Sequence, residues 1–205
     1  HSPASRLARA AGAPSLPSLP SLPSAPIRVA GNLPYNVASP ILFKLSDLVS
    51  AGHQFSDLTL MLQQEVVDRL IAAPGGRTYG VLSVLMQHVA RIEPLLALPP
   101  GAFRPPPKIR SALIRMRFHA PDPAVSNGSL FSLIVQSVFT RRRKTLANAL
   151  LSLDRHQQPE ASVRVPPIRP KEALARAGID AIRRPETLTL QEFANLTEVY
   201  ASVSL

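Results

Sequence analysis

The sequence contains no cysteine among its 205 residues. The chain therefore can form no disulfide scaffold, thiolate metal site or cysteine nucleophile. Its five histidines are scattered without the spacing of metal ligands, so we expect no metal site. The apolar runs are short, and none approaches the roughly 20 residues that a membrane-spanning helix needs, so we expect no membrane association.

Acidic residues are few. The chain has 13 Asp and Glu against 23 Lys and Arg, which gives a formal net charge of +10. A basic surface of this size favours a polyanionic partner such as a nucleic acid. The alternative is a merely soluble surface in a protein that is rich in arginine. Apolar residues make up 45% of the chain, which is ordinary for a globular protein.

Residues 1–26 form a low-complexity or displaced N-terminal segment. Residues 1–12 are rich in Ala and Arg and could form a short helix, whereas Ser-Leu-Pro occurs three times in residues 15–24. Proline at every third position suits a polyproline II spacer. The segment has no apolar stretch typical of a signal peptide. Because the first residue is His1, we expect the chain to be a fragment or a processed product of a longer protein.

Strands alternate with helices in residues 27–120. Strands are predicted at Ile27–Ala30, Leu58–Leu62, Ile92–Leu98 and Ser111–Phe118, with helices at about 39–49, 64–72 and 81–89. This alternation predicts an α/β fold with a parallel, doubly wound sheet. Such a cofactor-binding domain normally has a glycine-rich loop after its first strand. No such loop precedes Gly31, so we expect residues 27–120 to be only the distal half of the domain.

The pattern becomes entirely helical after Asp122 and Pro123. Helices are predicted at Leu130–Phe139, Thr145–Leu153, Lys171–Ala177 and Leu190–Ala201. Thr189 and Glu192 have the spacing of a capping box at the start of the last helix. We therefore interpret residues 121–205 as a small all-α domain.

The most informative stretch is Gly31-Asn32-Leu33-Pro34-Tyr35, which joins the first predicted strand to the first helix. An amide, a proline and an aromatic ring are unusual together in such a turn. The ordinary alternative is an Asn-Pro turn that caps a helix.

Four blocks of the sequence resemble the ribosomal RNA adenine N6-dimethyltransferase family. They are Val29–Leu45, Met61–Leu70 with Tyr79–Leu85, Phe103–Ala112 and Phe139–Leu150, and Gly178–Leu196 is similar to the family's last helices. The resemblance implies a partial, Rossmann-like methyltransferase sheet followed by a small helical domain. It also implies S-adenosyl-L-methionine as cofactor and the RNA of an immature small ribosomal subunit as substrate.

The resemblance assigns the catalytic site to Asn32, Leu33, Pro34 and Tyr35. The exocyclic amine of adenine is a poor nucleophile because its lone pair is delocalised into the ring. The Asn32 side-chain carbonyl and the Pro34 backbone carbonyl are predicted to accept hydrogen bonds from the two N–H groups of this amine. These hydrogen bonds would localise the lone pair on the nitrogen. Tyr35 offers a flat face for the base, and the resemblance places Phe103 near the same base. Gly31 and Asn32 are expected to contact the cofactor, whose other binding residues should precede Gly31.

Two basic stretches are predicted to bind RNA. The first is the proline-stiffened segment with Arg104 and Lys108, and the second is Arg141-Arg142-Arg143-Lys144, which we interpret as the opening of a helix. Four cations at a helix N-terminus oppose the helix dipole, which favours a polyanion there. The alternative for each stretch is a solvated basic edge.

The primary hypothesis is N6-dimethylation of small-subunit ribosomal RNA by a cytoplasmic, monomeric enzyme, of which this chain lacks most of the cofactor site. We therefore expect the isolated chain to bind cofactor weakly or not at all, and not to methylate. Two alternatives stay open. One is a non-catalytic ribosome-assembly factor that binds RNA, and the other is a relative that methylates adenine in large-subunit RNA or in DNA.

Overall fold

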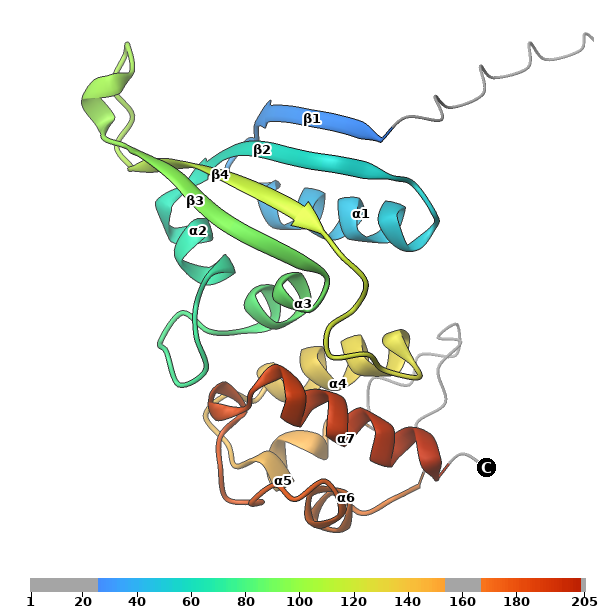
Figure 1. Cartoon of the computed structure of the whole chain (residues 1–205). Coiled ribbons are helices and arrows are strands. Elements are labelled where there is room, and N and C mark those ends of the chain that lie inside the picture. Colours follow the sequence, from blue (N-terminus) through green and yellow to red (C-terminus); the bar gives the residue numbers. More distant parts are fainter. Residues whose placement is uncertain (1–25, 154–166, 204–205) are drawn as a thin grey trace, which may run out of the picture.

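The computed structural model describes residues 26–153 and 167–203. A four-stranded sheet with helices on one face forms an α/β part, and a bundle of short helices packs against those helices (Figure 1). We call residues 27–118 the α/β part and residues 128–202 the helical part. The expected N-terminal helix and polyproline II segment, in residues 1–24, lie outside the described residues.

All four predicted strands are present in one sheet. They are β1 (Ile27–Asn32), β2 (Phe55–Gln63), β3 (Ala90–Leu98) and β4 (Ser111–Phe118), in the spatial order β1-β2-β4-β3. β1 pairs with β2 in parallel, whereas β4 is antiparallel to both β2 and β3. β1 therefore lies at one edge of the sheet and β3 at the other.

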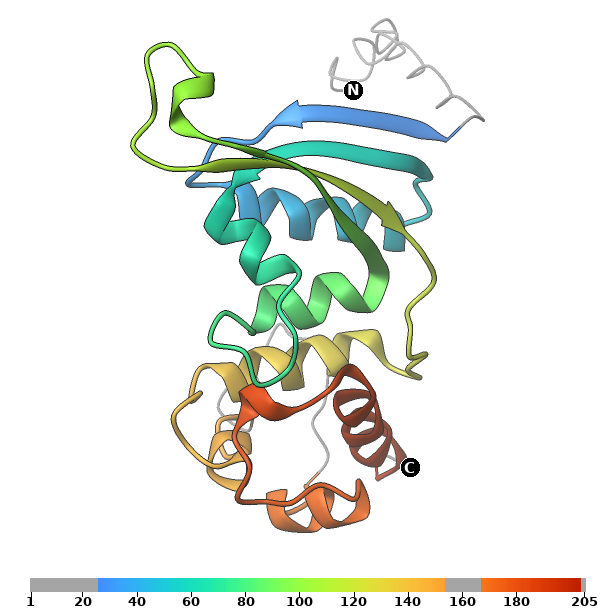
Figure 2. The ribbon, with the colours of Figure 1, turned by 60° about the vertical axis from the view of Figure 1, so that its left-hand side comes forward.

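The expectation of an all-parallel sheet is wrong for β4. A parallel return needs a crossover of a dozen or more residues, usually with a helix. The segment between β3 and β4, residues 99–110, contains only the 3-10 turn η1 (Pro100–Ala102). β4 therefore returns beside β3 as an antiparallel hairpin, and its loop projects beyond the sheet (Figures 1 and 2).

Three helices cover the same face of the sheet. They are α1 (Ala38–Ser50), α2 (Gln64–Leu70) and α3 (Val81–Val89), and Figure 2 shows all three on one side of the strands. The chain proceeds from β1 to β2 and then to β3 in one direction across the sheet. Right-handed crossovers in one direction place their helices on one face. The reversal of strand order that defines a doubly wound sheet does not occur within the described residues.

The core of the α/β part comes from alternate residues of the two central strands. Leu58, Leu60 and Leu62 of β2 are completely buried, as are Ile114 and Met116 of β4. The intervening residues of both strands are less deeply buried along most of their length. This alternation is that of a sheet with its helix-covered face in the core.

The helical part has the four helices that the periodicity predicts. They are α4 (Gly128–Phe139), α5 (Leu146–Leu150), α6 (Pro170–Arg176) and α7 (Leu190–Ser202), with the 3-10 turn η3 (Pro185–Thr187) before α7. The α5 helix is shorter than predicted, since it ends at Leu150 rather than Leu153. The capping box is confirmed, because the Glu192 N–H donates to the Thr189 hydroxyl and the Thr189 N–H donates to Glu192.

Aromatic contacts join the two parts where α3 meets α4. His88 of α3 stacks on Phe131 of α4 with ring centroids 4.2 Å apart. Its Nε2 donates a hydrogen bond to the Pro123 carbonyl at 2.8 Å. Burial lowers the pKa of His88, so the imidazole is neutral in this apolar junction. Nearby, Tyr79 meets the Phe139 ring edge-on at 6.2 Å.

The Tyr79 hydroxyl gives a test of this packing. Tyr79 is fully buried, its hydroxyl has no hydrogen-bond partner among the described residues, and burial raises its pKa to about 12. Replacing Tyr79 by Phe should leave the free energy of unfolding unchanged or raise it by about 1 kcal/mol, because an unpaired buried hydroxyl is removed. Urea denaturation measures this. As a control for sensitivity, Tyr79→Ala should lower the free energy of unfolding by about 3 kcal/mol. A decrease of more than about 1 kcal/mol in Tyr79→Phe would contradict the conclusion that the Tyr79 hydroxyl has no hydrogen-bond partner.

Candidate functional site

The Asn-Leu-Pro-Tyr turn begins where β1 leaves the sheet. Asn32 is the last residue of β1, opposite Met61 of β2, and its side chain is exposed. The Leu33 N–H donates to the Met61 carbonyl at 3.1 Å, which extends the pairing by one residue. Strand pairing therefore fixes the backbone at Asn32, and the exposed side-chain amide lies at the end of β1.

The backbone carbonyls of this turn are not equivalent. The Pro34 carbonyl accepts the Val37 N–H at 3.2 Å, which closes the turn into α1. Within the described residues the Leu33 carbonyl accepts no hydrogen bond. A carbonyl oxygen has two lone pairs, so Pro34 retains one free position and Leu33 retains two. Sequence reasoning chose Pro34 and gave Leu33 no separate role.

Tyr35 is tied to a residue that the sequence prediction did not include. Tyr35 is 38% exposed, and its hydroxyl lies 3.1 Å from the Ser111 hydroxyl. Ser111 is the first residue of β4 and is completely buried. The two residues are 76 positions apart in the sequence. The only sequence signal was that Ser111 belongs to the block Phe103–Ala112.

Phe103 lies in the loop between β3 and β4. Its side chain is half-buried and its N–H donates to the Pro100 carbonyl at 3.2 Å. β1 and β2 end toward this loop (Figures 1 and 2). No ring contact joins Phe103 to Tyr35 in the part of the chain that the structure describes. The stacking role of Phe103 therefore stays a prediction.

Gly31 was predicted to contact the cofactor. A Cβ atom placed on Gly31 would meet only the Leu33 side chain, at 4.0 Å, which is an ordinary contact. The neighbouring residues described here therefore do not require glycine at this position. Within the described sheet β1 pairs only with β2, so its outer edge stays available to a ligand or to another segment of chain.

The predicted RNA-binding residues lie on two loops. Arg104 and Lys108 are exposed in the β3–β4 loop, and neither forms an ion pair within the described ranges. Arg141, Arg143 and Lys144 lie in the turn between α4 and α5. These residues precede α5 and do not open it, because Thr145 is the N-cap and Leu146 the first helical residue.

Arg142 differs from its basic neighbours because it joins the two parts of the molecule. Its Nη2 donates to the Gly76 carbonyl at 3.2 Å, and its Nε lies 3.8 Å from the Glu186 carboxylate. The Glu186 carbonyl in turn accepts the Gly75 N–H at 2.6 Å. The loop between α2 and α3 is thereby held against η3, and an RNA phosphate would have to share this guanidinium.

Replacing Arg142 by alanine should lower the free energy of unfolding by about 1 to 2 kcal/mol, because the Glu186 carboxylate and the Gly76 carbonyl lose a charged partner. Arg143 is the matched control, since its exposed side chain makes no ion pair in the described structure, and Arg143→Ala should cost less than about 0.5 kcal/mol. Thermal and urea unfolding measure both variants. Equal effects of the two substitutions would contradict the role of Arg142 at the junction.

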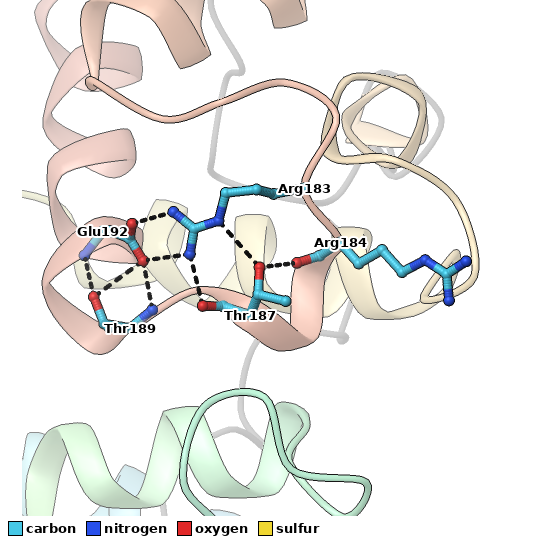
Figure 3. A network of polar contacts seen from close by, with 5 residues as sticks. All are labelled: Arg183, Arg184, Thr187, Thr189 and Glu192. Carbon is cyan, nitrogen blue, oxygen red and sulfur yellow. Dashed lines mark hydrogen bonds and ion pairs between the residues drawn. The ribbon is translucent and has the colours of Figure 1, made fainter.

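Two further arginines lie beside this junction. Arg77 follows Gly76 directly. Arg184 lies two residues before Glu186, and its side chain points away from Arg183 and Glu192 in Figure 3. Both are exposed, and neither forms an ion pair with any other described residue. We define Arg77, Arg141, Arg143, Lys144 and Arg184 as the junction cations. Sequence reasoning missed Arg77 and Arg184 because their proximity to the Arg141–Lys144 turn depends on the packing of the two parts.

Neither a metal site nor a membrane span is present in residues 26–153 and 167–203. No group of three His, Asp or Glu side chains there could hold a metal ion. No helix in the same ranges is long and apolar enough to cross a membrane.

The fold is that of the Rossmann-like methyltransferases. A dimethyladenosine transferase from Plasmodium falciparum superposes with a TM-score of 0.71 at 21% identity, covering 90% of this chain and 70% of that one. The 23S rRNA methyltransferase ErmE superposes with a TM-score of 0.57 at 21% identity, covering 88% of this chain and 67% of that one. The predicted α/β, Rossmann-like fold class is confirmed.

The chain belongs to the ribosomal RNA adenine dimethylase family, whose model matches residues 19–183. Proteins named ribosomal RNA small subunit methyltransferase A are 42% identical over 176 residues in Nitrosococcus oceani and 44% identical over 170 residues in Anaeromyxobacter sp. strain K. These alignments cover 85% and 83% of this chain, but 60% and 56% of the relatives. The chain thus spans somewhat more than half the length of these curated relatives.

Proposed function

We propose that this chain carries the acceptor half of a methyltransferase that modifies the exocyclic amine of adenine in small-subunit ribosomal RNA. The observation that carries the proposal is the exposed Asn32 amide at the end of β1, with the Leu33 and Pro34 carbonyls and the Tyr35 ring beside it in one turn. The family membership and the names of the 40%-identical relatives support the reaction class.

The two N–H bonds of the amine need two fixed acceptors. The Asn32 side-chain oxygen is the first. For the second we propose the Leu33 carbonyl in preference to that of Pro34, because Pro34 already accepts the Val37 N–H. Proline in the next position disfavours a helical conformation at Leu33, and its fixed φ stiffens the turn. Positioning of this kind supplies a large part of enzymatic rate enhancement.

The cofactor of the whole protein is proposed to be S-adenosyl-L-methionine, which would supply an electrophilic methyl group. Of the described residues, Gly31 and Asn32 are the ones we propose to contact it. The turn offers no acidic side chain for the cofactor's ribose, and none is recognisable in residues 1–30. We therefore propose that most of the cofactor site lies outside the sequence of this chain.

The RNA is proposed to lie along the junction cations and the β3–β4 loop with Arg104 and Lys108. Phosphates are the natural partners of cations that have no internal counter-ion, and such binding weakens steeply with salt. Arg142 is proposed to contribute mainly through the junction. We further propose that the protein acts as a cytoplasmic monomer.

A non-catalytic RNA-binding assembly factor is the second candidate function. It is favoured by the same junction cations, which need no cofactor in order to bind RNA. Large-subunit RNA or DNA as substrate has less support, because the relatives above 40% identity are named for the small subunit, whereas ErmE is similar in fold alone.

One methyl-transfer assay separates these functions. The 205-residue chain is compared with a chimaera in which residues 27–203 replace the equivalent residues of the Nitrosococcus oceani relative, using labelled cofactor and immature small subunits. We expect the chimaera to methylate. We expect the chain alone to bind RNA, to bind cofactor weakly or not at all, and not to methylate. Turnover by the chain alone would overturn the proposed incompleteness. A folded chimaera that binds RNA without methylating it would favour the assembly factor.

A further inference from the structure

The burial pattern of β4 breaks at its first residue. Ala112, Ile114 and Met116 face the helices and are buried, whereas Leu113 and Arg115 on the opposite face are only partly buried and Arg117 is exposed. Alternation places Ser111 on that second face, yet Ser111 has no exposed surface. Ser111 is therefore buried although the other residues on its face of β4 are partly or fully exposed.

The residue that reaches Ser111 there is Tyr35. The two hydroxyl oxygens are 3.1 Å apart, and either group can donate. Ser111 is itself held firmly, because it pairs with Gln63 of β2 on one side and with Leu98 of β3 on the other. Next to it, the Arg110 carbonyl accepts the Gln64 N–H at 3.0 Å. Tyr35 thus belongs to a short turn, but its hydroxyl is hydrogen-bonded to Ser111 of the central strand β4.

We infer that Ser111 is a positioning residue that holds the Tyr35 ring as a platform for the target base. The inference rests on the proposed function, and it adds a residue that touches neither base nor cofactor. A ring that is free to rotate presents its face to the base only part of the time. The hydrogen bond to Ser111 selects one orientation, so it should strengthen stacking without contributing any contact of its own.

The platform can be tested in the 205-residue chain without cofactor. The probe is a short single-stranded RNA with one 2-aminopurine, whose fluorescence is quenched on stacking. Because 2-aminopurine lacks the N6 amine, the probe reports stacking independently of the proposed amine acceptors. Tyr35→Ala should abolish the quenching, and Tyr35→Phe and Ser111→Ala should each weaken stacking about three- to tenfold, as loss of one hydrogen bond predicts.

The double variant Tyr35→Phe/Ser111→Ala distinguishes positioning from a general structural role. If Ser111 acts through the tyrosine hydroxyl, the double variant should equal either single variant. The near-UV circular dichroism of the chain, which contains three tyrosines and no tryptophan, should change with Ser111→Ala but not when the same change is made in the Tyr35→Phe background. Ser137→Ala is the matched control, since Ser137 is equally buried in α4, and it should leave stacking unchanged.

The outcomes separate the inference from the proposed function. Normal stacking in both Tyr35→Phe and Ser111→Ala, with loss in Tyr35→Ala, would overturn the role of Ser111 and leave the platform intact. Additive effects in the double variant would also overturn it, because Ser111 would then act by another route. Unchanged quenching in Tyr35→Ala would overturn both the platform and its anchor. If Ser111→Ala fails to fold, Tyr35→Phe still tests the inference. It removes the same hydrogen bond by changing Tyr35, which is exposed, instead of the buried Ser111.

Discussion

Replacing Asn32 by alanine in the methylating chimaera should lower the rate of methyl transfer by about 10²- to 10³-fold, with little change in RNA affinity. The amide oxygen is one of two acceptors proposed for the adenine amine, and removal of a single preorganised polar group of this kind typically costs that much. The effect should fall on kcat rather than on KM, because the interaction strengthens as the amine becomes tetrahedral. Single-turnover kinetics with labelled cofactor measure it directly.

The neighbouring Asn36 provides the matched control for Asn32. It is exposed, four residues further along the same turn, and forms no side-chain hydrogen bond among the described residues. Asn36→Ala should retain the rate within about twofold, since it lies outside the proposed acceptors. An Asn32→Ala chimaera as active as Asn36→Ala would mean that another group holds the amine. A higher KM with an unchanged kcat would mean that Asn32 contributes only to binding of the substrate ground state.

Local sequence rules predicted the secondary structure of this chain well. The strands followed from apolar runs, and the capping box of α7 followed from the three-residue spacing of Thr189 and Glu192. Both signals are local, because they depend on propensity and on hydrogen bonds within one turn. The direction of β4 was predicted wrongly for the same reason. Strand direction depends on whether the preceding connection can cross the sheet, and alternation within Ser111–Phe118 carries no such information.

The contacts that organise the candidate site are the ones that local rules could not supply. Tyr35 and Ser111 are brought together only by the pairing of β4 between β2 and β3. Arg142 looks like its neighbours in the run of four cations, and only the packing of the helical part against Gly75 and Gly76 distinguishes it. The motif was therefore identified as a set of residues, whereas the roles inside it depend on contacts between distant segments.

The cluster of polar contacts around Arg183 supports a large predicted effect on stability. Both guanidinium Nη atoms of Arg183 donate to the Glu192 carboxylate, and Nη2 also donates to the Thr187 carbonyl at 2.7 Å (Figure 3). The same carboxylate accepts the Thr189 N–H at 2.8 Å, and the Arg183 carbonyl accepts the N–H of Leu146 in α5 at 2.8 Å. The Glu192 side chain thus caps α7. It also holds Arg183, whose backbone carbonyl is hydrogen-bonded to the first residue of α5.

Glu192→Ala should lower the free energy of unfolding by about 3 kcal/mol, since a partly buried arginine loses its counter-ion and α7 loses half of its capping box. Glu172→Ala is the control. Glu172 forms a more exposed pair with Arg176 within one helix, and its loss should cost about 0.5 kcal/mol or less. Urea denaturation at neutral pH compares the two. Equal costs would show that the cluster contributes no more than a surface pair.

The stabilisation by Glu192 should also depend on pH and should be lost in acid. Hydrogen bonds from Arg183, and then from Thr189, lower the pKa of the Glu192 carboxyl below its usual value of 4.5, despite the opposing effect of burial. A carboxyl group with a depressed folded-state pKa stabilises the protein above its unfolded pKa, and this stability is lost as the pH falls through the folded value. Glu192→Gln removes the titration. The difference in unfolding free energy between wild type and Glu192→Gln should therefore be constant near neutrality and shrink below about pH 4.5. A difference that stays constant into the acid range would mean that hydrogen-bond geometry, rather than the charge of Glu192, holds α7 in place.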